Sequence, residues 1–140
     1  MTKLSLQSLL LSLLFFCAAP SMAQDSSIVL NEKVSAAGQM TAEKFTLLLK
    51  QQGFKSVIVN RPDQEQGNSV TVGQLRSIAE KAQVSVIYQP VTGGKISQTD
   101  VAEFAKYYNE LPKPILMVCR SGARSSALFN QAKAQGLLNE

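Results

Sequence analysis

The sequence predicts a single α/β domain with a mostly parallel central sheet flanked by helices. Short apolar runs alternate with helical patterns along the chain, which is the order that produces a parallel sheet. The length of 140 residues fits one domain. The third observation is the segment 115–125, where an apolar run ends on a cysteine and a short loop leads into a helical pattern. Ligands of parallel sheets bind beyond the carboxyl ends of the strands, so this segment is the first candidate for a site.

Five short segments of mainly aliphatic residues predict the strands. They are 28–30, 33–36, 56–59, 84–88 and 115–118. Polar or glycine-containing loops follow the last three strands, at 60–68, 90–95 and 120–124. We expect these three loops to form the pocket, because the carboxyl ends of parallel strands lie at one edge of a sheet.

Four helices are predicted from capping residues and apolar periodicity. Their expected starts are Thr41, Thr71, Ser97 and Ser125. Thr71 and Gln74 have the spacing of a capping box. Gly53 and Gly136 suit the ends of the first and last helices.

Residues 1–23 have the pattern of a cleavable signal peptide. Lys3 supplies a positive charge, 9–16 is an apolar run, and Ala23 offers a small residue at the cleavage site. This predicts a periplasmic or secreted domain, 24–140, that has no membrane segment after cleavage. An uncleaved anchor is the alternative.

Composition excludes several kinds of site. The chain has no histidine, so a Ser-His-Asp triad, a Cys-His pair and a histidine-ligated metal are excluded. Removal of the signal peptide would leave one cysteine, Cys119, and we expect no metal and no cofactor. The net charge of +4 comes from scattered residues with few aromatics, which argues against nucleic-acid binding.

The loop after Cys119 predicts an anion-binding cradle around a nucleophile. Backbone N–H groups at a helix N-terminus favour negative charge, and Arg124 can bind an oxyanion with two donors. The same field favours the thiolate form of Cys119. A thiol that is only a small buried apolar group is the alternative interpretation.

Four segments together resemble the beta-lactamase hydrolase-like family, in its phosphatase-like domain. They are 34–39, 57–63, 89–94 and 119–125. The resemblance implies a fold similar to dual-specificity tyrosine phosphatases, with Cys119 as nucleophile and Ser125 as hydrogen-bond donor to the thiolate. It also implies that Arg124 and the loop residues Arg120, Ser121, Gly122 and Ala123 hold the oxyanion.

Two features depart from the tyrosine phosphatase pattern. Four residues separate Cys119 from Arg124 where those enzymes have five, and four is the spacing of rhodanese-type sulfurtransferases. The loop 90–94 also lacks the aspartate that serves those enzymes as general acid. Asp63 is a candidate substitute, although it could instead cap its own loop, and Arg61 is expected to line the pocket or to be exposed.

Three functions remain open at this point. The first is an exported cysteine-dependent phosphatase-like hydrolase acting on a small anionic substrate or a phosphoprotein. The second, which the four-residue spacing favours, is a sulfurtransferase that carries a persulfide on Cys119. The family that the chain resembles also has members that occur beside sulfur-metabolism proteins. The third is a non-catalytic anion or redox sensor. A thiol reductant is a possible partner, and the sequence leaves the oligomeric state open.

Overall fold

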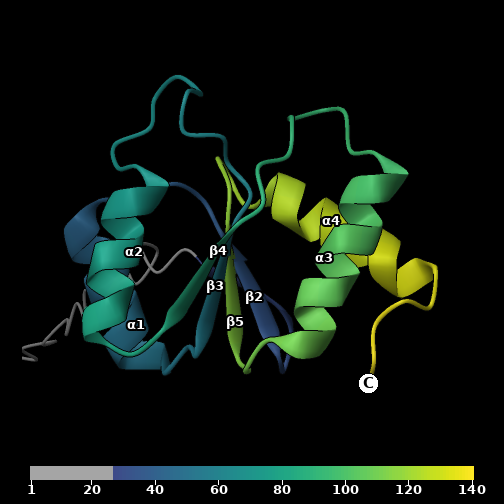
Figure 1. Ribbon diagram of the computed structural model, residues 1–140, viewed down its shortest axis with the longest axis horizontal. Helices are drawn as coiled ribbons and strands as arrows, with labels where there is room; N and C mark the ends of the chain where they lie inside the picture. Colours follow the sequence, from purple (N-terminus) through teal and green to yellow (C-terminus); the bar gives the residue numbers. More distant parts are fainter. Residues whose placement is uncertain (1–26) are drawn as a thin grey trace, which may run out of the picture.

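The alternating pattern folds into a five-stranded sheet with helices on both faces (Figure 1). The computed structural model describes residues 27–140, so the predicted signal peptide and its cleavage site lie outside the described residues. The strands are β1 Ser27–Asn31, β2 Val34–Ala37, β3 Ser56–Val59, β4 Ser85–Tyr88 and β5 Ile115–Val118. The helices are α1 Ala42–Gln52, α2 Val72–Lys81, α3 Gln98–Glu110 and α4 Ala123–Ala134.

The sheet has the order β1-β2-β5-β3-β4, with β5 in the centre. Of the four strand pairs within residues 27–140, only β1–β2 is antiparallel, so the prediction of a mostly parallel sheet is confirmed. Val118 at the end of β5 pairs with Ala37 on one side and with Val59 on the other. Cys119 therefore begins its loop between the carboxyl ends of two neighbouring parallel strands.

The core consists of two layers on opposite faces of the sheet. Helices α1 and α2 cover one face, and α3 and α4 cover the other (Figure 1). Leu116 and Val118 of β5 pack in the first layer, whereas Ile115 and Met117 pack in the second. Because β5 is buried on both faces, its sequence is a continuous apolar run and does not alternate.

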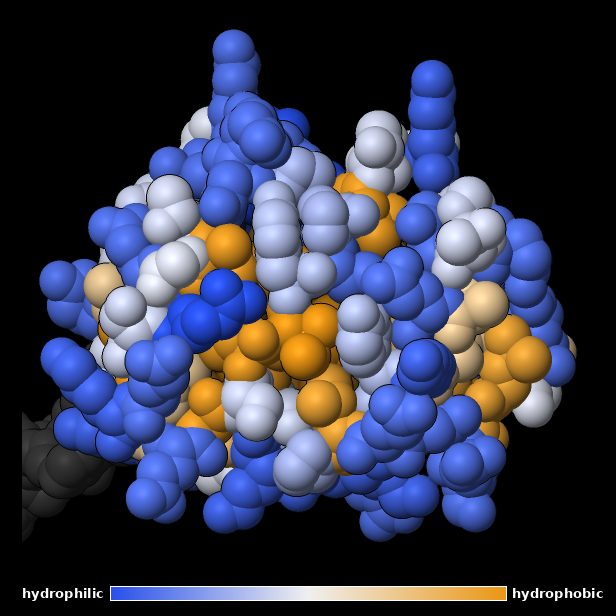
Figure 2. Space-filling model, viewed as in Figure 1, coloured by the Kyte–Doolittle hydropathy of each residue, from blue (hydrophilic) through white to orange (hydrophobic). Residues whose placement is uncertain are grey.

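The surface in Figure 2 follows from this layering. Apolar side chains gather in the centre of the view, along the sheet edge at β4, and polar side chains cover the helices on either side. Between residues 27 and 140, no helix combines the length and the apolar character needed to cross a membrane.

The helix caps agree with the sequence except at α4. Thr71 and Ser97 form capping boxes with Gln74 and Asp100. Helix α4 begins at Ala123, two residues earlier than predicted, after Gly122 with a left-handed φ of 93°. A glycine in this conformation turns the chain into the helix without a side-chain cap, so no capping side chain in the sequence marks this start. Arg124 consequently lies in the first turn of α4.

Candidate active site

Cys119 lines a cavity of about 340 Å³ beyond the end of β5. Cys119 is fully buried, and its Sγ accepts a hydrogen bond from the backbone N–H of Gly122 at 3.0 Å. The loop 119–122 therefore folds back on the sulfur before α4 begins. Among the described residues, Cys119 is the only free cysteine.

The environment of Cys119 favours the thiolate. Burial alone would raise the pKa of the thiol, but hydrogen bonds oppose this effect. The backbone and side chain of Ser125 and the backbone N–H groups of Ser121 and Gly122 provide these bonds, and the net result is a lowered pKa. A thiolate is the nucleophilic form of cysteine, so this geometry suits nucleophilic attack.

Ser125 links the thiol to a second buried residue, Asn60. The Ser125 hydroxyl donates to Oδ1 of Asn60 at 2.8 Å, and both side chains are fully buried. Nδ2 of Asn60 donates to the carbonyl of Gln89 at 3.1 Å, which fixes the orientation of the amide. Asn60 thus connects the ends of β3 and β4 with the first turn of α4.

Arg124 is held by a carboxylate from another loop. Its Nη1 and Nη2 donate to the two carboxylate oxygens of Glu65 at 3.0 and 3.1 Å, and Nη1 also donates to the carbonyl of Val91 at 3.0 Å. This hydrogen bond with Arg124 lowers the pKa of Glu65. Nε of Arg124 is buried and makes no hydrogen bond, so one charged donor is available to an anion in the cavity.

Two glycines allow the neighbouring loops to approach the cradle. A Cβ at Gly93 would lie 2.9 Å from Nη2 of Arg124, so the backbone of the loop 90–95 packs directly on the guanidinium group. A Cβ at Gly38 would lie 2.9 Å from the carbonyl oxygen of Arg120. That oxygen also accepts a hydrogen bond from the N–H of Gln39 at 3.1 Å, which fixes the first residue of the cradle loop.

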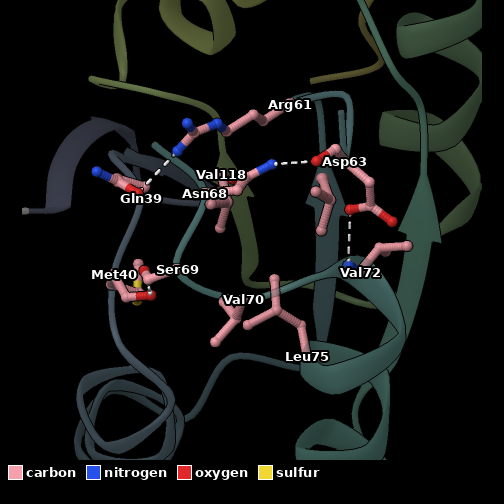
Figure 3. A pocket seen from close by; sticks show the side chains of 11 residues that line it. Gln39, Met40, Arg61, Asp63, Asn68, Ser69, Val70, Val72, Leu75 and Val118 are labelled. Carbon is pink, nitrogen blue, oxygen red and sulfur yellow. Dashed lines mark hydrogen bonds between the residues drawn. The ribbon is translucent and has the colours of Figure 1, made fainter. Parts of the chain in front are cut away.

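Arg61 and Asp63 line a second, small cavity of about 20 Å³ (Figure 3), and Nε of Arg61 lies 3.6 Å from Oε1 of Glu65. Oδ1 of Asp63 accepts from the N–H of Val72 at 2.9 Å and so caps the start of α2. Arg61 is buried, and its Nη1 donates to Oε1 of Gln39 at 2.9 Å. The structure therefore does not bring these two predicted site residues into the cavity of Cys119.

A model of the phosphatase-like domain of beta-lactamase hydrolase-like proteins matches residues 26–136. The chain belongs to this family. It is 32% identical over 103 residues to a beta-lactamase hydrolase-like protein of Agrobacterium fabrum, covering 74% of the chain and 24% of that protein. A relative from Xylella fastidiosa is 27% identical over 100 residues and covers 71% and 23%. The chain thus spans about a quarter of the length of these curated relatives.

Solved structures share the fold of this phosphatase-like domain. A candidate phosphatase from Neisseria meningitidis is 32% identical, with a TM-score of 0.67 and coverage of 78% of this chain and 77% of that one. The core catalytic domain of the PP-IP phosphatase SIW14 from S. cerevisiae is 15% identical, with a TM-score of 0.59 and coverage of 76% and 63%. The second likeness shows the fold alone, which is that of tyrosine-phosphatase-like proteins, as predicted.

The structure of this phosphatase-like domain also identifies residues that the sequence did not indicate. Arg120, Ser121, Ala123 and Arg124 line the cavity with Cys119, as expected, and Gly122 donates to the sulfur. Glu65, Asn60 and Gly93 were not predicted as site residues. Each of the three residues comes from a loop or strand end that is remote in sequence from Cys119. Only Glu65 carried a signal in the sequence, because it is a carboxylate in a loop that was predicted to form the pocket. In the described range, no three metal-ligating side chains lie together.

Proposed function

We propose that this domain is a cysteine-dependent phosphatase-like hydrolase in which Cys119 is the nucleophile. The observation that supports this most is the lowered pKa of a buried thiol at the end of β5, beside an arginine whose Nε has no partner. A tetrahedral oxyanion placed between these groups would be attacked by Sγ and held by Nε of Arg124 and by backbone N–H groups at the start of α4. The family and its phosphatase-like fold support the same chemistry.

Hydrolysis of an aryl phosphate by the wild-type protein and the Cys119→Ser variant tests this function. A serine hydroxyl remains protonated where the thiol is ionised, so we expect turnover to be lost in the variant. Equal turnover in both proteins would exclude Cys119 as the nucleophile. Arg124→Lys is a useful second variant, because lysine keeps the charge but loses the planar arrangement of donors.

A second candidate function is persulfide transfer, which the short cradle favours. Four residues separate Cys119 from Arg124, and the loop folds tightly enough for the N–H of Gly122 to reach the sulfur. Such a cradle suits a single added sulfur atom as well as a phosphoryl group. Intact mass after exposure to thiosulfate checks this alternative: one added sulfur on Cys119 supports it, and an unchanged mass excludes it for that donor.

We also infer that the domain acts outside the cytoplasm, on the basis of the pattern in residues 1–23. Its substrate would then be a small anion or phosphoprotein of that compartment, and a thiol reductant would be needed to keep Cys119 reduced. N-terminal sequencing of protein recovered from the periplasm or medium is expected to begin at Gln24. Retention of Met1 in the cytoplasmic fraction would contradict export.

A further inference from the structure

We propose that the substrate carries its phosphoryl group on a leaving group that departs as a stable anion, as in acyl phosphates and phosphoanhydrides. This inference rests on the proposed phosphatase function and names the substrate class for that site. It follows from the side chains that the cavity contains, and from the hydrogen bonds that already occupy the nearby carboxylates.

The cavity of Cys119 offers no side chain that can protonate a leaving oxygen. Its lining consists of Gly93, Gly94, Ile96, Cys119, Arg120, Ser121, Ala123, Arg124 and Ala127. The two arginines stay charged at any ordinary pH, so neither transfers a proton. The lining therefore provides a nucleophile and positive charge, but it lacks a carboxylic acid, a histidine or a tyrosine.

The two carboxylates on the loop 60–68 and the one in the first turn of α3 are all engaged in other hydrogen bonds. Both oxygens of Glu65 accept from Arg124, and this bond lowers the pKa of Glu65, so its carboxyl group stays ionised. Asp63 accepts from the N–H of Val72 at the start of α2. Asp100 accepts from the N–H of Ser97 in a capping box at the start of α3. Each of the three carboxylates is held by these hydrogen bonds outside the cavity lining, so none is placed to act as general acid.

A phosphoryl group on a good leaving group can be transferred here without any proton. The thiolate of Cys119 attacks phosphorus, an S–P bond forms, the P–O bond breaks, and its electron pair leaves with the carboxylate or phosphate product. Water then attacks the phosphocysteine, the S–P bond breaks, and the thiolate returns while the protons of water stay on inorganic phosphate. An alkyl phosphate differs, because its alkoxide product needs a proton as it leaves, and general acid catalysis is typically worth about 10²–10⁴-fold.

A series of substrates with different leaving groups tests this inference. We would measure kcat/KM for acetyl phosphate, pyrophosphate, p-nitrophenyl phosphate, phenyl phosphate and glycerol 3-phosphate. We expect kcat/KM to fall by about a hundredfold or more from the best anhydride to the alkyl ester, the smallest effect of a missing acid. Preference for acetyl phosphate would identify acyl phosphates as the substrate class, and preference for pyrophosphate would identify phosphoanhydrides.

The outcomes separate this inference from the proposed function. Hydrolysis of all the esters at similar kcat/KM would overturn the inference while confirming a phosphatase. No hydrolysis of any of these substrates, including the anhydrides, would overturn the proposed function itself. Glu65→Gln and Asp63→Asn provide a matched pair of variants: we expect each to leave the ratio between substrates unchanged, whereas a selective loss on poor leaving groups would identify that residue as the acid.

The pH profile gives an independent readout. The charged groups around the thiol are Arg120, Arg124 and, behind Arg124, Glu65. If no general acid takes part, attack requires only that the thiol of Cys119 be ionised. We therefore expect kcat for an anhydride to rise with pH to a plateau. A falling basic limb in kcat, which reports groups in the enzyme–substrate complex, would reveal an essential acid and contradict the inference.

Discussion

The hydroxyl of Ser125 has one proton and two possible acceptors, the amide oxygen of Asn60 and the thiolate of Cys119. The proton is directed to Asn60 at 2.8 Å, although a hydrogen bond from the same side chain contributes to the lowered pKa of Cys119. Each acceptor therefore competes for a single donor. Asn60 is consequently a positioning residue: it acts on the sulfur through Ser125.

Removing this competition should make Cys119 more acidic. In Asn60→Ala the Ser125 hydroxyl can donate to the thiolate alone, so we expect the pKa of Cys119 to fall further. The buried carbonyl of Gln89 also loses its donor, which should lower the free energy of unfolding by about 1–3 kcal/mol. The pH dependence of alkylation by iodoacetamide measures the pKa, and urea denaturation measures the stability.

Ser125→Ala is the control for this pathway. It should raise the pKa of Cys119, and Asn60→Ala should have no further effect on that pKa in the Ser125→Ala protein. An equal shift from Asn60→Ala with and without Ser125 would show that Asn60 acts on the thiol by another route.

Gly93 shapes the site because it lacks a side chain. In Gly93→Ala the new Cβ would meet the guanidinium group of Arg124 at 2.9 Å, so Arg124 must move. Moving the guanidinium group away from its position beside the cavity should lower kcat/KM by about tenfold or more, with little loss of stability because the loop is exposed. Gly73→Ala is the matched control, since it adds the same methyl group in α2, where the nearest atom would be Oγ1 of Thr71 at 3.7 Å. Equal losses in the two variants would contradict this role.

At the scale of elements, the segment between β3 and α2 contains one carboxylate that stabilises a helix and another that contacts the site. Asp63 caps α2, whereas Glu65, two residues later, reaches across to Arg124 in α4. The sequence pointed to Asp63 in this segment, whereas the carboxylate that contacts Arg124 is that of Glu65, and neither lines the cavity of Cys119 itself. Spacing along a loop does not say which side chains turn inward, because hydrogen bonds to distant elements decide it.

The role of Asp63 can be tested by stability. Asp63→Ala removes the acceptor for the N–H of Val72, and loss of a cap of this kind costs about 0.5–2 kcal/mol. We therefore expect a lower free energy of unfolding together with unchanged alkylation of Cys119 at each pH. A large loss of thiol reactivity at unchanged stability would show that Asp63 acts in the active site.

The elements themselves were largely predictable, for identifiable reasons. Caps such as Thr71 and Ser97 and the continuous apolar run of β5 are local signals, and the structure has all three as expected. The cradle was predictable too, since its residues are adjacent in sequence. Asn60 and Glu65 were not, because their importance comes from contacts made across 65 and 59 positions of the chain.

At the scale of the whole molecule, the pair of Glu65 and Arg124 joins the loop that leads into α2 with helix α4 on the opposite face of the sheet. The folded state lowers the pKa of Glu65, so the pair contributes stability above the carboxyl's unfolded pKa. That contribution should be lost as the pH falls through the lowered value. Because the carboxylate is partly exposed, we expect less than about 1 kcal/mol.

Glu65→Gln isolates this contribution. Urea denaturation between neutral and acidic pH should show a smaller acid-induced loss of stability in the variant than in the wild type, because glutamine does not titrate. The same slope in both proteins would show that the pair adds nothing to the stability of the fold.

The central place of β5 has a consequence for which parts of the molecule can open. Its four residues are buried, and it pairs with β2 and β3 along its whole length. Its amide hydrogens should therefore exchange with solvent deuterium only when the entire domain unfolds. The loops that carry Glu65 and Gly93 contain exposed residues, so we expect their amide hydrogens to exchange by local opening. A substrate could thus be admitted and a product released while the strand that carries the nucleophile stays fixed.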